Sequence, residues 1–256
     1  MEKQLYFFID ESGDPNFYAK RKRPLWTEPT FEPLLMLGMV VVENRKVLRQ
    51  AILNFQNQLL TDPLFNTIHS LNKPNWYLHA SQDHADVRLK FIEFLREQPH
   101  IKCYIVIGRK IPEIFHNKHN GKAAEFYFDL LNKLLTLFEF DGVDQHMLFL
   151  SGRQSNTEER FVNAVRKAMQ RQSGLASDTH FKCRIIPSSD YPELSVVDYF
   201  LWVLNRYITQ GDKRYFAALE NKFDCIYDVY EEEGKGRIYN ASNAFDLAKA
   251  SKFVIK

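Results

Sequence analysis

Three carboxylates stand close together near the start of the chain, directly after a short apolar run. Residues 5–9 (LYFFI) precede Asp10 and Glu11, and Asp14 follows after a Ser-Gly pair. Removing an ionised carboxylate from water is unfavourable unless a positive charge or a hydrogen-bond donor meets it. Hard divalent cations such as Mg²⁺ prefer carboxylate oxygens as ligands. The pattern indicates a divalent-cation site at Asp10, although a turn that begins at Asp10, with Gly13 at positive φ, is an open alternative.

A second acid, Asp198, interrupts the most apolar helix that the sequence predicts. Between residues 194 and 204 only Ser195 and Asp198 break a run of aliphatic and aromatic residues. A charge in so apolar a helix is unfavourable unless it is ion-paired or bound to a metal. We therefore expect Asp198 to face Asp10 across a divalent ion. The structural alternative is an ion pair with a basic residue such as Arg206.

Other side chains could act beside such an ion. His79 precedes a predicted helix and could transfer protons, although a His near a helix start is more often structural. Arg109 and Lys110 follow a predicted strand at residues 101–107 and could position a phosphate group. Ser12, in the Ser-Gly turn, is a further candidate contact to the substrate.

Two more patterns have ordinary structural interpretations. Lys20–Arg23 are four consecutive cations in a polar loop. They predict a solvated loop, or alternatively a contact with a phosphate backbone if an acid cluster beside them binds metal. His116 and His119 have the spacing of metal ligands on a helix, but the Asn, Lys and Gly around them favour an exposed loop.

Composition sets limits on the class of protein. The chain has 256 residues, of which 45% are hydrophobic and 26% charged, as in an ordinary globular protein. The net charge of +2 does not by itself indicate a nucleic-acid-binding protein, so any basic surface must be local.

Cysteines and apolar runs bear on the compartment. Cys103, Cys183 and Cys225 form no Cys-x-x-Cys pair, which argues against a zinc knuckle or a disulfide framework. The longest apolar run, residues 34–42, is too short to span a bilayer, and the N-terminus lacks a signal-peptide pattern. We expect a cytoplasmic protein with no membrane partner.

Strands and helices alternate along the chain, which predicts an α/β fold with helices on both faces of a sheet. In such sheets, residues at strand ends and helix starts converge on the functional crevice. No repeat or linker divides the chain, so we expect one domain over residues 1–256, with a C-terminal helix and hairpin extension at about 210–256. The expected strands are 5–9, 34–42, 101–107, 146–150 and 181–186; the expected helices are 45–60, about 83–95, 122–140, 157–171, 192–207 and 212–223, with a hairpin at 225–239.

The stretch FIDESGD and the late helix VVDYFLWVLNRY resemble motifs of a widespread prokaryotic domain-of-unknown-function family regarded as ribonuclease H-like in fold. IVIGRK, AAEFYFDLLNKLL and SGRQSNTEERF are similar in character and order, so the resemblance spans nearly the whole chain. It implies a mixed sheet and a metal-dependent nuclease that hydrolyses phosphodiester bonds of DNA or RNA. Asp10 and Asp198 would bind Mg²⁺ or Mn²⁺, with Asp10 bridging two ions about 4 Å apart, and Glu11 would be a further metal ligand or a base beside the ions.

The chain departs from the family pattern at several positions. Ser195-Val196-Val197-Asp198 stands where the family usually has Gln-x-Ala-Asp, and Tyr77 stands where a Glu is common. Ser151 and Gly152 follow the fourth strand, where an acid is expected.

A two-ion centre needs about four carboxylates, so one or two are unaccounted for. The possible substitutes are Asp14, Asp190 and Glu193. The missing acids favour a second hypothesis, a catalytically weakened nucleic-acid-binding or scaffold protein of a mobile-element or phage-defence system. A third is a hydrolase or transferase that acts on nucleotides or another phosphorylated small molecule.

Overall fold

The strands join in one mixed sheet in the computed structural model, which describes residues 4–140, 145–152, 157–173, 180–232 and 235–250. In this part of the chain the strand order is β5-β4-β1-β2-β3-β6-β7. β1 pairs antiparallel with β2 and parallel with β4, so it lies inside the sheet. The strands are β1 Gln4–Ser12, β2 Leu34–Val42, β3 Lys102–Arg109, β4 Gln145–Ser151, β5 His180–Ile186, β6 Phe223–Glu232 and β7 Lys235–Tyr239.

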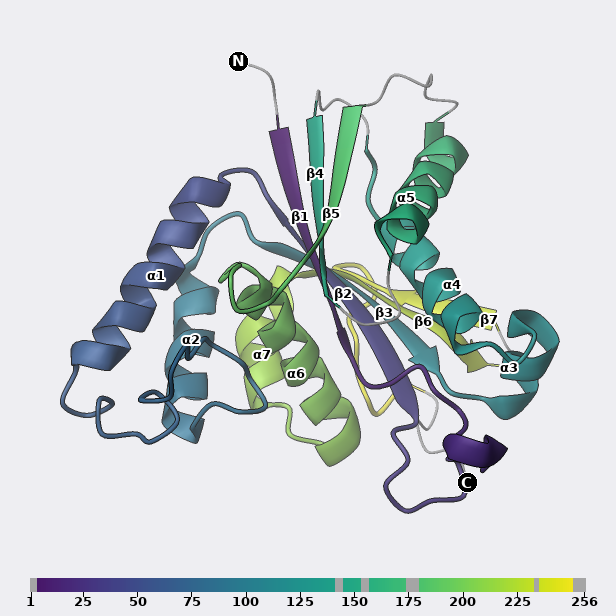
Figure 1. The fold of residues 1–256 in the computed structure, drawn as a ribbon, viewed down its shortest axis with the longest axis horizontal. Coiled ribbons are helices and arrows are strands. Elements are labelled where there is room, and N and C mark those ends of the chain that lie inside the picture. Colours follow the sequence, from purple (N-terminus) through teal and green to yellow (C-terminus); the bar gives the residue numbers. More distant parts are fainter. Residues whose placement is uncertain (1–3, 141–144, 153–156, 174–179, 233–234, 251–256) are drawn as a thin grey trace.

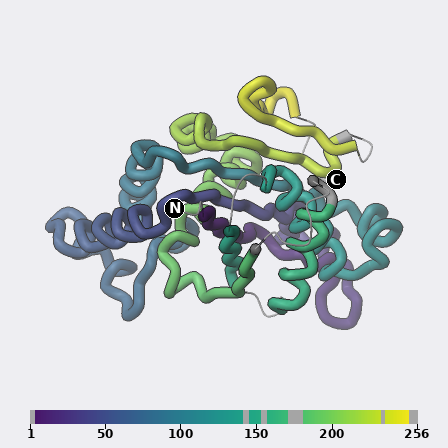
Figure 2. Tube along the Cα trace, turned by 90° about the horizontal axis from the view of Figure 1, so that it is seen from above, coloured from purple at the N-terminus to yellow at the C-terminus, as the bar shows by residue number. Residues whose placement is uncertain are grey.

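Helices cover both faces of this sheet (Figure 1), which confirms the α/β prediction. One face packs against α1, α2, α6 and α7, and the other against α3, α4 and α5. Figure 2 shows β5 and the C-terminal hairpin at opposite edges. The helices are α1 Arg45–Thr61, α2 Ala85–Glu97, α3 Pro112–His119, α4 Ala123–Thr136, α5 Glu158–Ser173, α6 Leu194–Gln210 and α7 Arg214–Leu219, with 3₁₀ turns η1 Lys20–Lys22 and η2 Glu220–Lys222.

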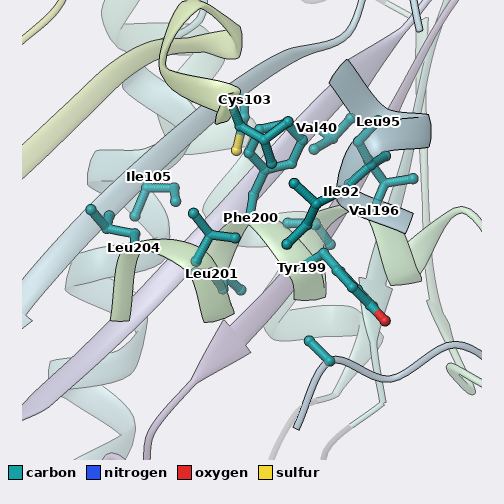
Figure 3. Packing of buried hydrophobic residues seen from close by; sticks show 14 of the residues in the cluster. Val40, Ile92, Leu95, Cys103, Ile105, Val196, Tyr199, Phe200, Leu201 and Leu204 are labelled. Atoms are coloured by element: carbon teal, nitrogen blue, oxygen red, sulfur yellow. The ribbon is translucent and has the colours of Figure 1, made fainter. Parts of the chain in front are cut away.

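Helix α6 is buried because almost every residue in it meets either the sheet or another helix. Figure 3 shows Phe200 and Leu201 of α6 among side chains from α2 and from the strands β2 and β3. The helix packs against β1 and β2. Gly38 of β2 makes this approach possible, since a Cβ there would lie 2.9 Å from Val197 Cγ2. Gly38 is also the register partner of Asp10.

Several elements differ from the sequence predictions. β1 continues through Ser12, and β3 continues through Arg109, so Asp10 and Arg109 lie within strands rather than after them. The expected exposed loop at the two histidines is helix α3. Helix α2 begins at Ala85, with His84 as its N-cap, and α6 begins at Leu194. The prediction for the hairpin turn lies partly outside the described residues, which omit 233–234.

The His116 and His119 pair does not form a metal site. His119 is buried, and its Nε2 lies 3.0 Å from the Tyr230 hydroxyl. His116 Nε2 lies 2.8 Å from the hydroxyl of Tyr18. Each imidazole thus has a separate tyrosine partner.

Of the helices described, none combines the length and apolar character needed to cross a membrane.

Candidate active site

A small pocket opens where β1 and β4 meet the first turns of α6. Its volume is about 170 Å³. The strands supply its floor, the segment 77–79 one wall, and α6 with the loop before it the other. The residues that line it are Asp10, Glu11, Tyr77, Leu78, His79, Ser151, Ser188, Leu194, Ser195 and Asp198.

Asp10 points to the α6 face of the sheet, because side chains alternate along a strand and Phe8 packs on that face. Its carboxylate accepts a hydrogen bond from the Glu11 backbone N–H at 2.9 Å. Burial, followed by the charges of Glu11 and Asp198, raises the pKa of Asp10 to about 8. Among the ion pairs of the described residues none involves Asp10. In the absence of a bound cation, Asp10 therefore holds a proton at neutral pH.

Asp198 contacts the wall of the pocket that the segment 77–79 forms. Its Oδ2 accepts a hydrogen bond from the Ala80 backbone N–H at 2.7 Å and lies 3.4 Å from Nδ1 of His79. The hydrogen bond with Asp198 raises the pKa of His79, although burial opposes that shift. The alternative of an Arg or Lys partner for Asp198 is not found among the ion pairs of the described residues: Arg206 pairs with Asp212 at 2.9 Å, and the basic side chain beside Asp198 is His79.

Asp83 fixes the segment that carries His79. Its buried carboxylate accepts hydrogen bonds from the His79 backbone N–H at 2.8 Å, from Trp76 Nε1 at 3.1 Å and from the Tyr199 hydroxyl at 2.6 Å. Tyr199 follows Asp198 directly in α6. The same turn of helix therefore positions one pocket carboxylate and anchors the wall opposite it.

Arg88 holds the far side of the same segment. Its guanidinium donates to the carbonyl oxygen of Ala80 at 3.1 Å and to that of Asp83. It lies 5.1 Å from the ring of Trp202. Sequence reasoning did not single out Asp83 as a site residue, because its partner Tyr199 lies 116 residues away in the sequence.

Two serines complete the pocket next to Asp10. The Ser151 and Ser188 hydroxyls lie 2.9 Å apart, and a hydrogen bond from Ser151 favours the charged form of Asp10. Ser151 ends β4 where the family resemblance led us to expect an acid. Sequence reasoning singled out neither Ser151 nor Ser188 as a site residue, although the end of a strand beside β1 was the available signal.

Glu11 has a hydrogen-bond partner outside the pocket. It borders the pocket, but its carboxylate accepts a hydrogen bond at 3.2 Å from the hydroxyl of Tyr127 in α4, on the opposite face of the sheet. Ser12 ends β1 opposite Met36 and does not line the pocket. In the described ranges, no group of three or more His, Cys, Asp or Glu side chains is arranged to hold a metal ion.

The predicted phosphate contacts also lie elsewhere. Arg109 is buried and donates hydrogen bonds to the Asp228 carboxylate, among them one from Nε at 3.0 Å and one from Nη2 at 2.7 Å. Lys110 is buried, with Nζ 4.3 Å from the centroid of the Phe31 ring, and burial lowers its pKa to about 8. Neither residue lines the pocket. Both side chains are held in the structure rather than presented to a substrate.

The substitute carboxylates are not available at the pocket. Glu193 is fully buried and pairs with Arg45 at 2.7 Å and with Arg49 at 3.1 Å. Asp14 and Asp190 are exposed and do not line the pocket. The pocket thus presents Asp10 and Asp198 as its two directed carboxylates, with a histidine and serines around them.

A comparison with protein-family models gave no match to the chain, and a search of curated proteins gave no similar protein.

Proposed function

We propose that the chain is a metal-dependent nuclease with a ribonuclease H-like fold, in which Asp10 and Asp198 bind Mg²⁺ or Mn²⁺. The observation that carries the proposal is the placement of both carboxylates on one pocket, with no ion-pair partner for Asp10 in the described part of the chain. The fold assignment is supported by the mixed sheet, in which β1 pairs antiparallel with β2 and parallel with β4. Helix α6, which carries Asp198, packs on β1, which carries Asp10.

The residues of the pocket fit one divalent ion better than two. Burial and neighbouring negative charges raise the pKa of Asp10. A bound cation would stabilise the ionised carboxylate and so oppose this shift. Oxygen ligands are available from Asp10, Asp198 and Ser151. A two-ion centre would need about four carboxylates, and Glu11 and Glu193 are directed to other partners.

Each side chain has a separate task in this proposal. A bound Mg²⁺ or Mn²⁺ supplies Lewis-acid stabilisation of a phosphoryl oxygen. Asp10 and Asp198 hold the ion. The hydrogen bond with Asp198 raises the pKa of His79 and so favours its imidazolium form, which can donate a proton to the departing oxygen. Ser151 orients Asp10 through its hydrogen bond.

The size of the pocket favours a polymer over a free nucleotide. A volume of about 170 Å³ is below the roughly 300–1,000 Å³ typical of pockets that enclose a whole small molecule. The pocket can receive an ion and one phosphate group while the rest of the chain stays outside. This argues against the nucleotide hydrolase or transferase hypothesis.

The test is hydrolysis of single- and double-stranded DNA and RNA in the presence of Mn²⁺ or Mg²⁺. We expect Asp10→Asn and Asp198→Asn each to reduce the rate about 10²–10³-fold, since each removes a carboxylate that stabilises charge in the transition state. Asp190→Asn removes an exposed acid next to the site and should leave the rate unchanged. Equal rates in all variants would refute the proposal.

The scaffold hypothesis keeps one observation in its favour, namely that Glu11 and Glu193 are directed to other partners. Calorimetric titration with Mn²⁺ separates the two functions. The nuclease requires binding that is lost in Asp10→Asn. Absence of binding to the unmodified protein would favour a non-catalytic role.

A further inference from the structure

The loop between β1 and β2 presents a cluster of cations that the pocket does not use. We call residues Lys20–Arg23 the basic turn. All four residues are exposed. Arg23 pairs with Glu28 at 2.9 Å, whereas the ion pairs found in the described ranges include none with Lys20, Arg21 or Lys22. Figure 1 shows this part of the loop as the short dark purple element at the lower right.

The backbone of the basic turn is held in one conformation. The Ala19 N–H donates to the Arg23 carbonyl oxygen at 2.9 Å and closes the turn. Arg21 and Lys22 have φ angles of 60° and 55°. Non-glycine residues with such angles are uncommon and persist where the surrounding structure holds them.

The surrounding structure is a set of aromatic contacts at the base of the loop. Phe17 is buried and stacks on Phe115 of α3 at 3.8 Å between ring centroids. Tyr18 packs edge-on against Trp26 at 5.0 Å. Lys110 lies between the loop aromatics, with Nζ 5.5 Å from the centroid of Phe17. The loop is therefore a structured platform, and its cations are presented before any partner arrives.

We propose that the basic turn contacts the phosphodiester backbone of a nucleic acid. A backbone with closely spaced negative charges is complementary to four adjacent cations, and each contact releases counterions. Presentation on a fixed turn lowers the ordering entropy lost on binding. The choice of a nucleic acid rests on the proposed function. It is favoured over a membrane because Ala19 and Pro24, which flank the turn, offer no large apolar side chain for insertion.

The experiment measures binding to a short fluorescein-labelled DNA duplex in EDTA, by anisotropy, at salt concentrations between 50 and 200 mM. The test variant is K20Q/R21N/K22N, which removes three charges and places Asn, which tolerates positive φ, at the two constrained positions. The control K46Q/K73Q/K90Q removes three exposed lysines from α1, the following loop and α2. Circular dichroism verifies that both variants fold.

We expect the test variant to lower the magnitude of the slope of log K against log salt by about 2.7, since each phosphate contact contributes about 0.9. The unmodified protein should then lose about 40-fold more affinity than the variant over this range of salt. The single change Lys20→Gln, outside the positive-φ positions, should lower the slope by about 1. The control should keep the slope of the unmodified protein.

Equal slopes in the unmodified protein and K20Q/R21N/K22N would overturn the proposal. If K20Q/R21N/K22N lost binding to phosphatidylserine vesicles but bound DNA as the unmodified protein does, the proposed nucleic-acid contact would be overturned in favour of a membrane contact. Because EDTA removes divalent ions, these outcomes concern the basic turn alone. Failure of the nuclease would appear separately, as absence of hydrolysis with Mn²⁺ by a protein that still binds DNA.

Discussion

Two carboxylates on the same face of the sheet, Asp228 and Asp10, have neighbours of opposite charge. Asp228 of β6 is fully buried and meets the guanidinium of Arg109 at 2.7 Å. Burial raises the pKa of Asp228, and Arg109 opposes that shift. Asp10 of β1 is instead flanked by Glu11 and Asp198, whose charges add to the effect of burial. Asp228 thus has a counter-charge within the fold, whereas the proposed cation would supply one to Asp10.

The charge of the neighbouring residues distinguishes a structural acid from a candidate metal ligand more clearly than its position in the strand does. Both acids lie within strands of the sheet, and the sequence alone does not show which one has a basic partner. The following changes test the distinction, beginning with the largest expected effect.

Asp228→Asn should reduce the free energy of unfolding by about 3–5 kcal/mol, because it leaves the buried Arg109 guanidinium without its counter-charge. Urea unfolding measures the loss. Glu28→Gln, in the exposed pair with Arg23, should change stability by less than about 1 kcal/mol. If the two substitutions have the same small effect, the Arg109–Asp228 pair does not stabilise the fold as described.

The affinity for Mn²⁺ should rise about 50-fold between about pH 6 and 8, because binding requires the Asp10 carboxyl group to lose its proton. The pKa of about 8 places this proton loss at the upper end of that range. Deprotonation of His79, whose pKa is also raised, acts in the same direction by removing a nearby positive charge. Calorimetry at several pH values measures the slope, and an affinity independent of pH would contradict the assignment of Asp10.

Tyr199→Phe should reduce stability by about 1–3 kcal/mol, because the buried Asp83 carboxylate loses a donor. It should also lower the pKa of His79 toward its ordinary value by loosening the contact with Asp198, which NMR titration can follow. Tyr239→Phe is the matched control, since its hydroxyl donates to the buried Glu231 at 2.9 Å away from the pocket. We expect Tyr239→Phe to cause a similar loss of stability but to leave the pKa of His79 unchanged. Equal pKa changes in both variants would remove the positioning role of Asp83.

Asp10→Asn should raise the stability of the metal-free protein at pH 8 by at least about 1 kcal/mol, which corresponds to a Tm increase of at least about 2 °C. The sign follows from proton binding: between about pH 4 and 8 folded Asp10 holds a proton that the unfolded chain has released, so stability falls as pH rises. Thermal unfolding of Asp10→Asn should lack this contribution, and the two proteins should converge near pH 4. A stability loss, as expected for Asp228→Asn, would make Asp10 structural.

The sequence predicted the pairing of Asp10 with Asp198 because both signals were local: a carboxylate in an apolar strand and another in an apolar helix. It also predicted His79 as a site residue, and the structure places all three on one pocket. Their catalytic and metal-binding roles stay proposals.

The errors arose where a strand was longer than its apolar core. Because β1 extends through Ser12, Glu11 turns to the face opposite Asp10. Because β3 extends through Arg109, that side chain reaches Asp228. The role of Asp83 depends on Tyr199, far along the chain, and no local pattern encodes such a contact.

Gly38 has a consequence for how this site could change. Because Gly38 has no side chain, β2 can lie in close contact with Val197 and Leu201 of α6, which belong to the same helical turn as Asp198. Any larger residue would lift the helix from the sheet beside Asp10 and widen the span between the two acids. A single methyl group at this position would therefore act as a spacer between the two acids, and it would change the ionic radius that the proposed cation site accepts without touching either carboxylate.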